Sequence, residues 1–336
     1  RIHSAYQQQR IYPLEGFIGR EANYAKSWLG IEEIGIQPSE FAKIATILLL
    51  GNYLFSIGKR ITELHYFLLG FLITLLPVSL ILLQPDMGTA LVYLPIFLFM
   101  SYIAGAKIHH VLFIFLVGIL TLILGMLPEY QLYILGEEYL IINILTNFEY
   151  VKFILLSLVI ILVLSVLGYF FIKEKYFFWI GYFSTLFIFS YTSPFLISKI
   201  LSAYQIKRLI IFTDPFKDSR GFGMQTINSM NAIGSGGFWG KGLFNGTQSQ
   251  LKYIPQQHTD FIFSILAEEW GFIGGLFIII LFLVIILRGI RIISITKDNY
   301  AVNIGTGIIT MLFFHVFINI GMVMGIMPIT GIPVFF

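Results

Sequence analysis

Eight long apolar runs, separated by short polar segments, dominate the hydrophobic pattern of this chain. They cover residues 40–57, 65–83, 87–106, 111–127, 152–172, 176–197, 261–287 and 301–327. Most are close to the roughly 20 residues that an α-helix needs to cross a bilayer. They lack both the two-residue alternation of an outer-membrane barrel and the amphipathic stripe of a soluble helix. The pattern predicts an all-α fold, a polytopic membrane helix bundle with eight visible spans.

Basic residues fall in four short connections between these runs: Lys59, Arg60, Lys107, Lys173, Lys175, Arg288, Arg291 and Lys297. Counting along the chain, all four connections lie on one side of the membrane. The loop 128–150, on the opposite side, has four glutamates and no lysine or arginine. Since short cytoplasmic loops are enriched in Lys and Arg, the basic loops are predicted to be cytoplasmic.

Composition supports the membrane assignment. The chain of 336 residues is 57% apolar and only 12% charged, whereas soluble domains carry about 25% charged residues. Its 34 Phe and 18 Tyr exclude a disordered chain. The absence of cysteine excludes disulfides, a thiol nucleophile and a zinc–thiolate site.

The runs divide the chain into four parts. Residues 1–38 are polar, residues 39–197 carry helices with the outer loop 128–150, residues 198–260 form a large outer loop, and residues 261–336 return to the membrane. The large loop has a net charge of +4, more than the +3 of the whole chain. A basic outer loop of this length does not serve topology, so an anionic ligand is expected there.

Two polar clusters stand at the predicted outer ends of helices. In the first, QPSEFAK at 37–43, Ser39 is a candidate helix N-cap and Glu40 can pair with Lys43. In the second, QPDMGTA at 84–90, Asp86 is either an N-cap or a functional carboxylate. Both the structural and the functional interpretation stay open for these clusters.

Two further clusters involve the last two apolar runs. His315 and Asn319, four residues apart, are better explained as interhelical hydrogen-bonding groups than as a catalytic pair. Asp260, with His258 beside it, is either an N-cap or a general base at the water–lipid boundary. A base there suits a substrate with one end in the bilayer and a phosphorylated head outside.

Five motifs in this chain resemble those of the RodA/FtsW family of bacterial membrane proteins, also called SEDS. They are QPSEFAKI at 37–44, QPDMGTA at 84–90, IGSGGFWGKGLFNGTQSQ at 233–250, HTDFIFSILAEEWGFIG at 258–274 and NIGMVMGIMPITGIP at 319–333. They occur in the family's order and span nearly all of the chain. The form of the third motif is closer to the rod-shape (RodA) branch than to the division branch.

The resemblance implies a peptidoglycan glycosyltransferase that polymerises lipid II during cell elongation, outside the bacterial cytoplasmic membrane. It also implies a bundle of about ten helices, so further helices are expected before and after this chain. Residues 128–197 would be an additional helix pair. Gln256 replaces the glutamate common in the family.

The same resemblance assigns roles to individual residues. Asp260 corresponds to the essential aspartate, and Glu40 and Lys43 to residues of the family's outer cavity. Arg208 corresponds to the loop arginine. A class B penicillin-binding transpeptidase and the elongation machinery are the implied partners, and no nucleic acid is expected.

The predicted mechanism is a single displacement with inversion. Asp260 would be the general base, and undecaprenyl pyrophosphate would leave, its charge met by Arg208, Lys43 and Lys241. His258 would lie beside the base. Glu40 and Asp86 would orient the cations or help to hold a divalent metal.

Two other functions stay open at the level of the sequence. A transporter that flips lipid II would concentrate polar groups at the midplane and in broken helices. A non-catalytic scaffold for a transpeptidase would not need Asp260.

Overall fold

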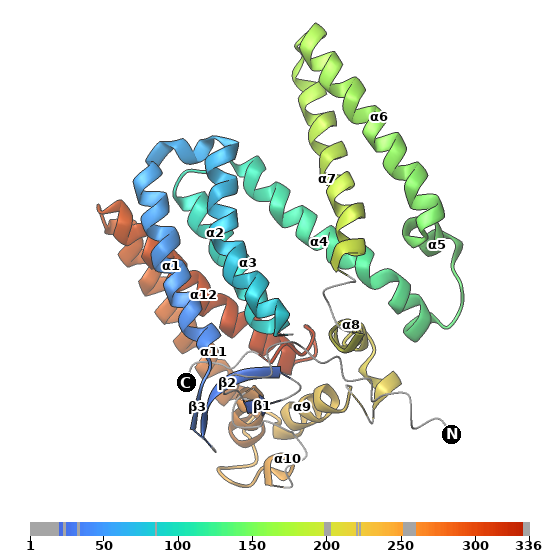
Figure 1. Ribbon diagram of the computed structural model, residues 1–336. Coiled ribbons are helices and arrows are strands. Elements are labelled where there is room, and N and C mark those ends of the chain that lie inside the picture. The colour runs from blue at the N-terminus through green and yellow to red at the C-terminus, as the bar shows by residue number, and fades with distance from the viewer. Residues whose placement is uncertain are drawn as a thin grey trace.

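The computed structural model describes residues 20–22, 25–31, 34–84, 86–197, 203–219, 221, 223–250 and 260–331 (Figure 1). Within these residues all eight apolar runs are helical, which confirms the all-α membrane fold. The helices are α1 (Pro38–Ile57), α2 (Leu64–Leu83), α3 (Met87–Ile103), α4 (Ile108–Tyr130), α6 (Phe148–Ile172), α7 (Lys175–Ile197), α11 (Ile262–Ile295) and α12 (Asn299–Val323).

Six helical segments of the described chain are long and apolar enough to cross a membrane. Each of these six segments contains one of the helices α1, α2, α4, α6, α11 and α12. Helix α3 is apolar but shorter, with 17 residues. Helix α7 is not among the six, so its membrane crossing stays a prediction.

The core lies between α1, α2, α3 and α12. Ile47, Leu50, Ile96, Phe97 and Met100 are all at most 1% exposed there. Helices α6 and α7 instead form a hairpin that packs on α4 and projects away from the other helices (Figure 1). Of the side chains in α6 only Val151 and Ser165 are buried, so this helix presents an apolar surface on nearly every side.

The two ends of the bundle differ in charge and in structure. The α1–α2 and α6–α7 turns lie at the top of Figure 1, while the sheet, α8, α9 and α10 lie at the bottom. The end with the four basic turns is called the basic end below. The end with the sheet and α8–α10 is called the loop end.

A small antiparallel sheet precedes α1, which the sequence analysis did not predict. Its strands are β1 (Arg20–Ala22), β2 (Ala25–Ile31) and β3 (Ile34–Ile36), in the order β1-β2-β3. Leu29 pairs with Ile36, and Ile31 pairs with Ile34. The hairpin brings the chain to the N-terminus of α1 at the loop end.

The described part of the 198–260 segment consists of short helices. They are α8 (Ala203–Ile211), the 3₁₀ helix η3 (Pro215–Asp218), α9 (Gly223–Gly236) and α10 (Thr247–Gln250). The other short elements are η1 (Gly58–Thr62), the π-helical η2 (Gln131–Leu135) and α5 (Leu140–Thr146). Ser229 of α9 donates a hydrogen bond of 2.8 Å to the carbonyl oxygen of Val323, which ties this segment to α12.

Helix α11 is broken at Gly271, whose φ of 69° and ψ of −164° are not helical. The glycine-rich segment after α9 supplies the hydrogen bonds that the break removes. The amide groups of Lys241 and Gly242 donate to the carbonyls of Glu268 and Glu269, both at 3.0 Å. In return the amides of Phe272 and Ile273 donate to residues 237 and 238, at 2.9 and 3.3 Å.

Gly271 is required by this arrangement. A Cβ added at Gly271 would lie 2.3 Å from the amide nitrogen of Gly240, and its positive φ disfavours any other residue. We expect Gly271→Ala to lower the free energy of unfolding by about 1–3 kcal/mol. Thermal unfolding in detergent measures this change.

Gly275→Ala, in the same helix, is the matched control. Its Cβ would meet Phe263 at 3.4 Å, an ordinary contact, so its unfolding midpoint should stay near that of the unmodified protein. Equal midpoints for the two variants would contradict the structural role of Gly271.

Candidate functional site

Lys43 is the centre of a buried polar group near the start of α1. Its side chain is 1% exposed, and its ammonium lies 2.7 Å from Glu40 Oε2 and 2.8 Å from His315 Nε2. His315 Nδ1 lies 2.8 Å from the carbonyl oxygen of Met311. Because a carbonyl can only accept, Nδ1 carries the hydrogen and Nε2 accepts from Lys43. The predicted Glu40–Lys43 pair is confirmed.

Asp86 caps α3, as one of the two interpretations predicted. Its carboxylate accepts from the amide of Thr89 at 3.1 Å and from the hydroxyl of Thr89 at 2.8 Å. It also accepts from Gln37 Nε2 at 2.9 Å, so the two QP motifs are in direct contact. Lys43 interacts electrostatically with Asp86 as well as with Glu40. The predicted N-cap at Ser39 is wrong, because Gln37 holds the cap position of α1 and Ser39 lies inside the helix.

Asp260 lies directly before α11 and is buried, with 8% of its surface exposed. Phe261 holds the N-cap position of α11, so the capping interpretation of Asp260 is wrong. A Cβ on Gly331 would lie 3.6 Å from Asp260 Oδ2, so the chain after α12 passes close to this carboxylate. Asn319 Nδ2 donates to the backbone carbonyl of Asp260 at 2.8 Å.

Helix α12 therefore connects the two groups. His315 contacts Lys43, and Asn319, one turn further along, holds the backbone of Asp260. The prediction that these two residues are interhelical hydrogen-bonding groups is confirmed. Both are fully buried, at 0% exposure.

The buried polar groups lie at one level of the bundle. At about 1.5 Å of rise per residue, Lys43 lies about 24 Å from Lys59. His315 contacts Lys43 and therefore lies at the same level. The hydrocarbon core of a bilayer is about 30 Å thick. With Lys59 at the basic boundary, Lys43 and His315 lie close to the opposite boundary, at the loop end.

Lys241 occupies a different place from the one expected. Its ammonium lies 2.8 Å from Glu268 Oε1 and also donates to Ser235 and Thr247, at 2.7 and 2.8 Å. Glu268 is 0% exposed, and its Oε1 also accepts from the amide of Gln248 at 3.1 Å. This cluster fixes the glycine-rich segment to α11. A role of Lys241 in substrate binding stays a prediction.

The other two predicted residues lie in the large loop. Arg208 lies on α8, half-buried, next to the buried Leu209 and Ile210. His258 lies outside the described residues.

A divalent metal does not fit the carboxylates that the sequence suggested for it. Glu40 is paired with Lys43, and Asp86 accepts three hydrogen bonds from Gln37 and Thr89. In the described part of the chain, no three His, Asp or Glu side chains gather where they could hold a metal ion together.

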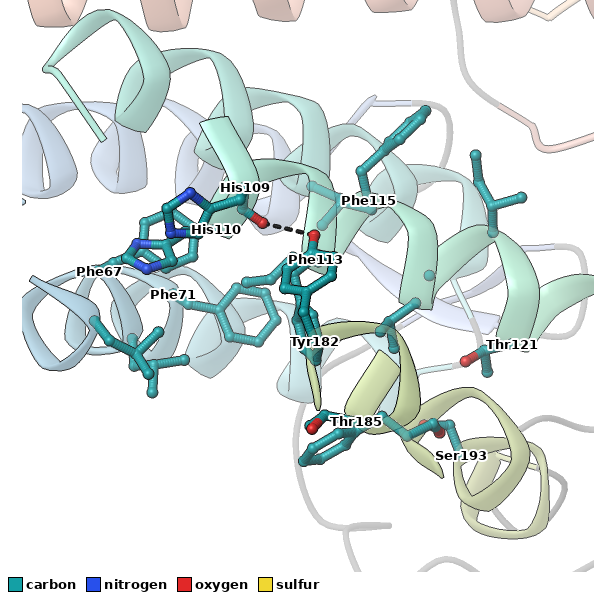
Figure 2. A pocket seen from close by; sticks show the side chains of 18 of the residues that line it. Phe67, Phe71, His109, His110, Phe113, Phe115, Thr121, Tyr182, Thr185 and Ser193 are labelled. Carbon is teal, nitrogen blue, oxygen red and sulfur yellow. Dashed lines mark hydrogen bonds between the residues drawn. The ribbon is translucent and has the colours of Figure 1, made fainter. Parts of the chain in front are cut away.

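A large apolar cavity of about 1120 Å³ lies between α2, α3, α4, α6 and α7. Figure 2 shows Phe67 and Phe71 of α2, aromatic residues of α4 and Tyr182 of α7 around it. The hydroxyl of Tyr182 donates to the carbonyl of His109 at 2.8 Å, which joins α7 to α4. The cavity extends to Met87, the residue after Asp86.

The cavity and the role of Glu268 were missed at the level of the sequence. The acidic pair in LAEEWG, within an otherwise apolar run, was the available signal for Glu268. It did not identify Lys241 as the partner, because the two are far apart in the chain. Packing of five helices forms the cavity, which no local pattern encodes.

The fold and the site define a polytopic membrane protein with a buried polar centre at one boundary of the bilayer. The family model of the FtsW, RodA and SpoVE cell cycle proteins matches residues 11–136 and 139–336. The chain belongs to this family, as predicted.

Individual relatives agree. The peptidoglycan glycosyltransferase RodA of Treponema pallidum (strain Nichols) is 45% identical over 315 residues, covering 94% of this chain and 72% of the relative. Stage V sporulation protein E of Bacillus subtilis (strain 168) is 33% identical over 320 residues, covering 94% of this chain and 66% of the relative. This chain is thus shorter than both relatives. The predicted enzyme class matches the name of the first relative and is confirmed.

A solved structure also matches. One chain of a structure described as the structural coordination of polymerization and crosslinking by a peptidoglycan synthase complex has a TM-score of 0.59 and 25% identity. The match covers 94% of this chain and 68% of the solved one. Together with the apolar helices, these relatives indicate a multi-pass protein of the bacterial cytoplasmic membrane.

The buried Glu268 cluster gives a stability prediction. We expect Glu268→Gln to lower the free energy of unfolding by about 1–3 kcal/mol, because Lys241 loses its counter-ion and an amide replaces a carboxylate that accepts several hydrogen bonds. Thermal unfolding in detergent measures the loss.

The adjacent Glu269→Gln is the matched control. Glu269 is partly exposed, and its substitution should change stability by less than about 0.5 kcal/mol. If both variants unfold at the same temperature, the cluster does not hold the glycine-rich segment in place.

Proposed function

We propose that this chain polymerises lipid II into glycan strands at the outer face of the cytoplasmic membrane, with Asp260 as the general base. The observation that carries the proposal is the position of Asp260. It is buried at the loop end, and Asn319 of α12 holds its backbone at 2.8 Å. The same helix contacts Lys43, so a carboxylate and a cation are organised around one rigid element.

The proposed side of the membrane follows from charge. The basic end carries the short loops that are rich in lysine and arginine, as cytoplasmic loops are. The loop end is then extracytoplasmic. A lipid-linked substrate would have its pyrophosphate at the level of this boundary.

The reaction balances as a single displacement. The 4-hydroxyl of a GlcNAc attacks C1 of the MurNAc at a lipid-linked glycan end, and Asp260 takes the hydroxyl proton. A new C1–O bond forms as the bond from C1 to pyrophosphate breaks, and the electron pair leaves with undecaprenyl pyrophosphate. The configuration at C1 inverts.

The charge of the leaving group has to be balanced for this step. Arg208, half-buried on α8, is the proposed direct contact. Lys43 is held by Glu40 and His315, so its proposed part is a fixed positive charge near the boundary. Lys241 is paired with Glu268, so its contribution would be to position the glycine-rich segment.

The apolar cavity is the proposed place for a prenyl chain. Its lining is almost wholly apolar and aromatic (Figure 2). It extends from Leu64 and His109 at the basic end to Met87 beside Asp86. A hydrocarbon chain there would have its head near the polar centre.

The proposed partner is a class B penicillin-binding transpeptidase, in the elongation machinery. The support is the match to a chain from a complex that coordinates polymerization and crosslinking. The partner's crosslinking would use the strands made here.

A flippase has one feature in its favour, the broken helix α11. In transporters such breaks line the substrate path. Here the backbone groups at the break are bonded to the glycine-rich segment, so they support a loop instead of an ion or substrate.

The central test is polymerisation of lipid II by the full-length protein with Asp260→Asn. A lost general base should lower the rate about 10²–10⁴-fold. The length of the glycan product on a gel gives the measurement.

Asp298→Asn is the matched control. Asp298 caps α12 at the basic end, accepting from the amide of Tyr300 at 3.0 Å, and asparagine caps equally well. Unchanged polymerisation by Asp260→Asn would refute the base assignment. Lipid II translocation in liposomes that is insensitive to Asp260→Asn, without polymerisation by either protein, would favour the flippase.

The cavity is tested with Gly118→Phe. A Cβ at Gly118 would meet Leu94 at 3.7 Å, an ordinary contact, so a larger side chain can enter the cavity without a clash at its base. We expect the KM for lipid II to rise several-fold, because the prenyl chain loses room. The KM for a short-chain analogue should not change, and an equal rise for both substrates would argue against prenyl binding.

A further inference from the structure

Four large apolar side chains are exposed on the glycine-rich segment after α9. Phe238, Trp239, Leu243 and Phe244 are 56%, 79%, 59% and 79% exposed. Residues 237–244 are called the aromatic loop below. Apolar side chains gathered in this way mark a contact surface for lipid or protein.

The aromatic loop is fixed to the break in α11. Backbone hydrogen bonds join it to residues 268–273 on both sides of Gly271. The ring of Phe238 stacks on Phe272, with centroids 5.8 Å apart and an interplanar angle of 20°. The level of the break in the membrane therefore sets the level of the loop.

The charge pattern of α11 gives this level. Residues 271–287 carry no charge and cover about 26 Å at about 1.5 Å per residue. Arg288 follows and is exposed, so it has to lie at the basic boundary of the bilayer. Since the hydrocarbon core is about 30 Å thick, the break falls within a few ångströms of the opposite boundary.

The one charge of the aromatic loop is neutralised inside the protein. Lys241 turns toward the buried Glu268, with 2.8 Å between the charged atoms. Gly240 and Gly242 have φ values of 81° and 92°, which let the backbone fold back at this point. Of the side chains left outside, Trp239 is of a type that is enriched at the membrane interface, and Phe238, Leu243 and Phe244 are apolar side chains that suit the hydrocarbon next to it.

We propose that the aromatic loop inserts into the lipid leaflet at the loop end, with Trp239 at the boundary between headgroups and hydrocarbon. The occupant of this surface is lipid, because the loop is continuous with the exposed Phe272 of α11, a helix long and apolar enough to cross a membrane, and lies at the level of the bilayer edge. The inference rests on the membrane position of α11 and not on the proposed function. If the proposed function holds, this leaflet is the outer one, and the loop sets the height of Asp260 relative to the substrate's pyrophosphate.

Trp239 is an intrinsic probe for the test. The chain has four tryptophans, and replacing Trp28, Trp179 and Trp270 by Phe leaves Trp239 alone. The full chain is reconstituted in liposomes with phospholipids brominated near the headgroup or near the bilayer centre. We expect strong quenching by the shallow bromines, weaker quenching by the deep ones and little quenching by aqueous iodide.

A tryptophan at position 216 is the matched control. Phe216 is 69% exposed in η3, in the same large loop, but stands between Asp214, Lys217 and Asp218. With Phe216→Trp in a background that includes Trp239→Phe, iodide should quench several-fold more strongly than it quenches Trp239, and bromolipid should quench weakly.

Two results would overturn the inference. One is iodide quenching of Trp239 as strong as at position 216. The other is the absence of quenching by either bromolipid, which would mean that the loop contacts water or a protein partner instead of lipid. If the triple replacement does not fold, the difference between the unmodified protein and Trp239→Phe isolates the same signal. Because the readout needs no activity, it is independent of the polymerisation assay.

Discussion

Backbone hydrogen bonding inside a bilayer is the constraint on which this structure depends. No water is available in the hydrocarbon core, so every amide and carbonyl needs a partner within the protein. Helix α11 breaks at Gly271, near the membrane edge, and would leave such groups unpaired. The glycine-rich segment pairs with them through the amides of Lys241 and Gly242 and the carbonyls of residues 237 and 238. A loop that is remote in sequence is thereby built into a membrane helix, about three turns after Asp260.

Buried charge imposes the second constraint. Lys43 and Glu268 are both almost fully buried, and an unpaired charge in such a place would be costly. Lys43 is balanced by Glu40 and hydrogen-bonded to His315, and Glu268 by Lys241. Each arrangement joins elements that are distant in the chain, α1 to α12 and the glycine-rich segment to α11. These two arrangements thus hold together separate elements of the loop end.

The fold was predictable from the sequence where a helix coincides with a continuous apolar run. Apolar stretches gave all eight helices, and the N-cap was one of the two interpretations left open for Asp86. The sheet before α1 was missed because its strands are short and lie in a segment that appears merely polar. Ser39 was misplaced because Pro38 already lies inside α1, one position beyond the cap at Gln37. The partner of Lys241 could not be inferred, since the contact with Glu268 exists only after α11 breaks and the loop folds back.

The same reasoning explains why the proposed site lies where two halves of the chain meet. A glycosyl transfer from a lipid-linked donor needs a general base that is accessible to water and a hydrocarbon chain that stays in the bilayer. The reacting atoms therefore have to lie at the boundary between water and bilayer. Helix α12 contributes two consecutive turns at this level. His315 contacts Lys43 of α1, and Asn319 donates to the backbone of Asp260, which precedes α11.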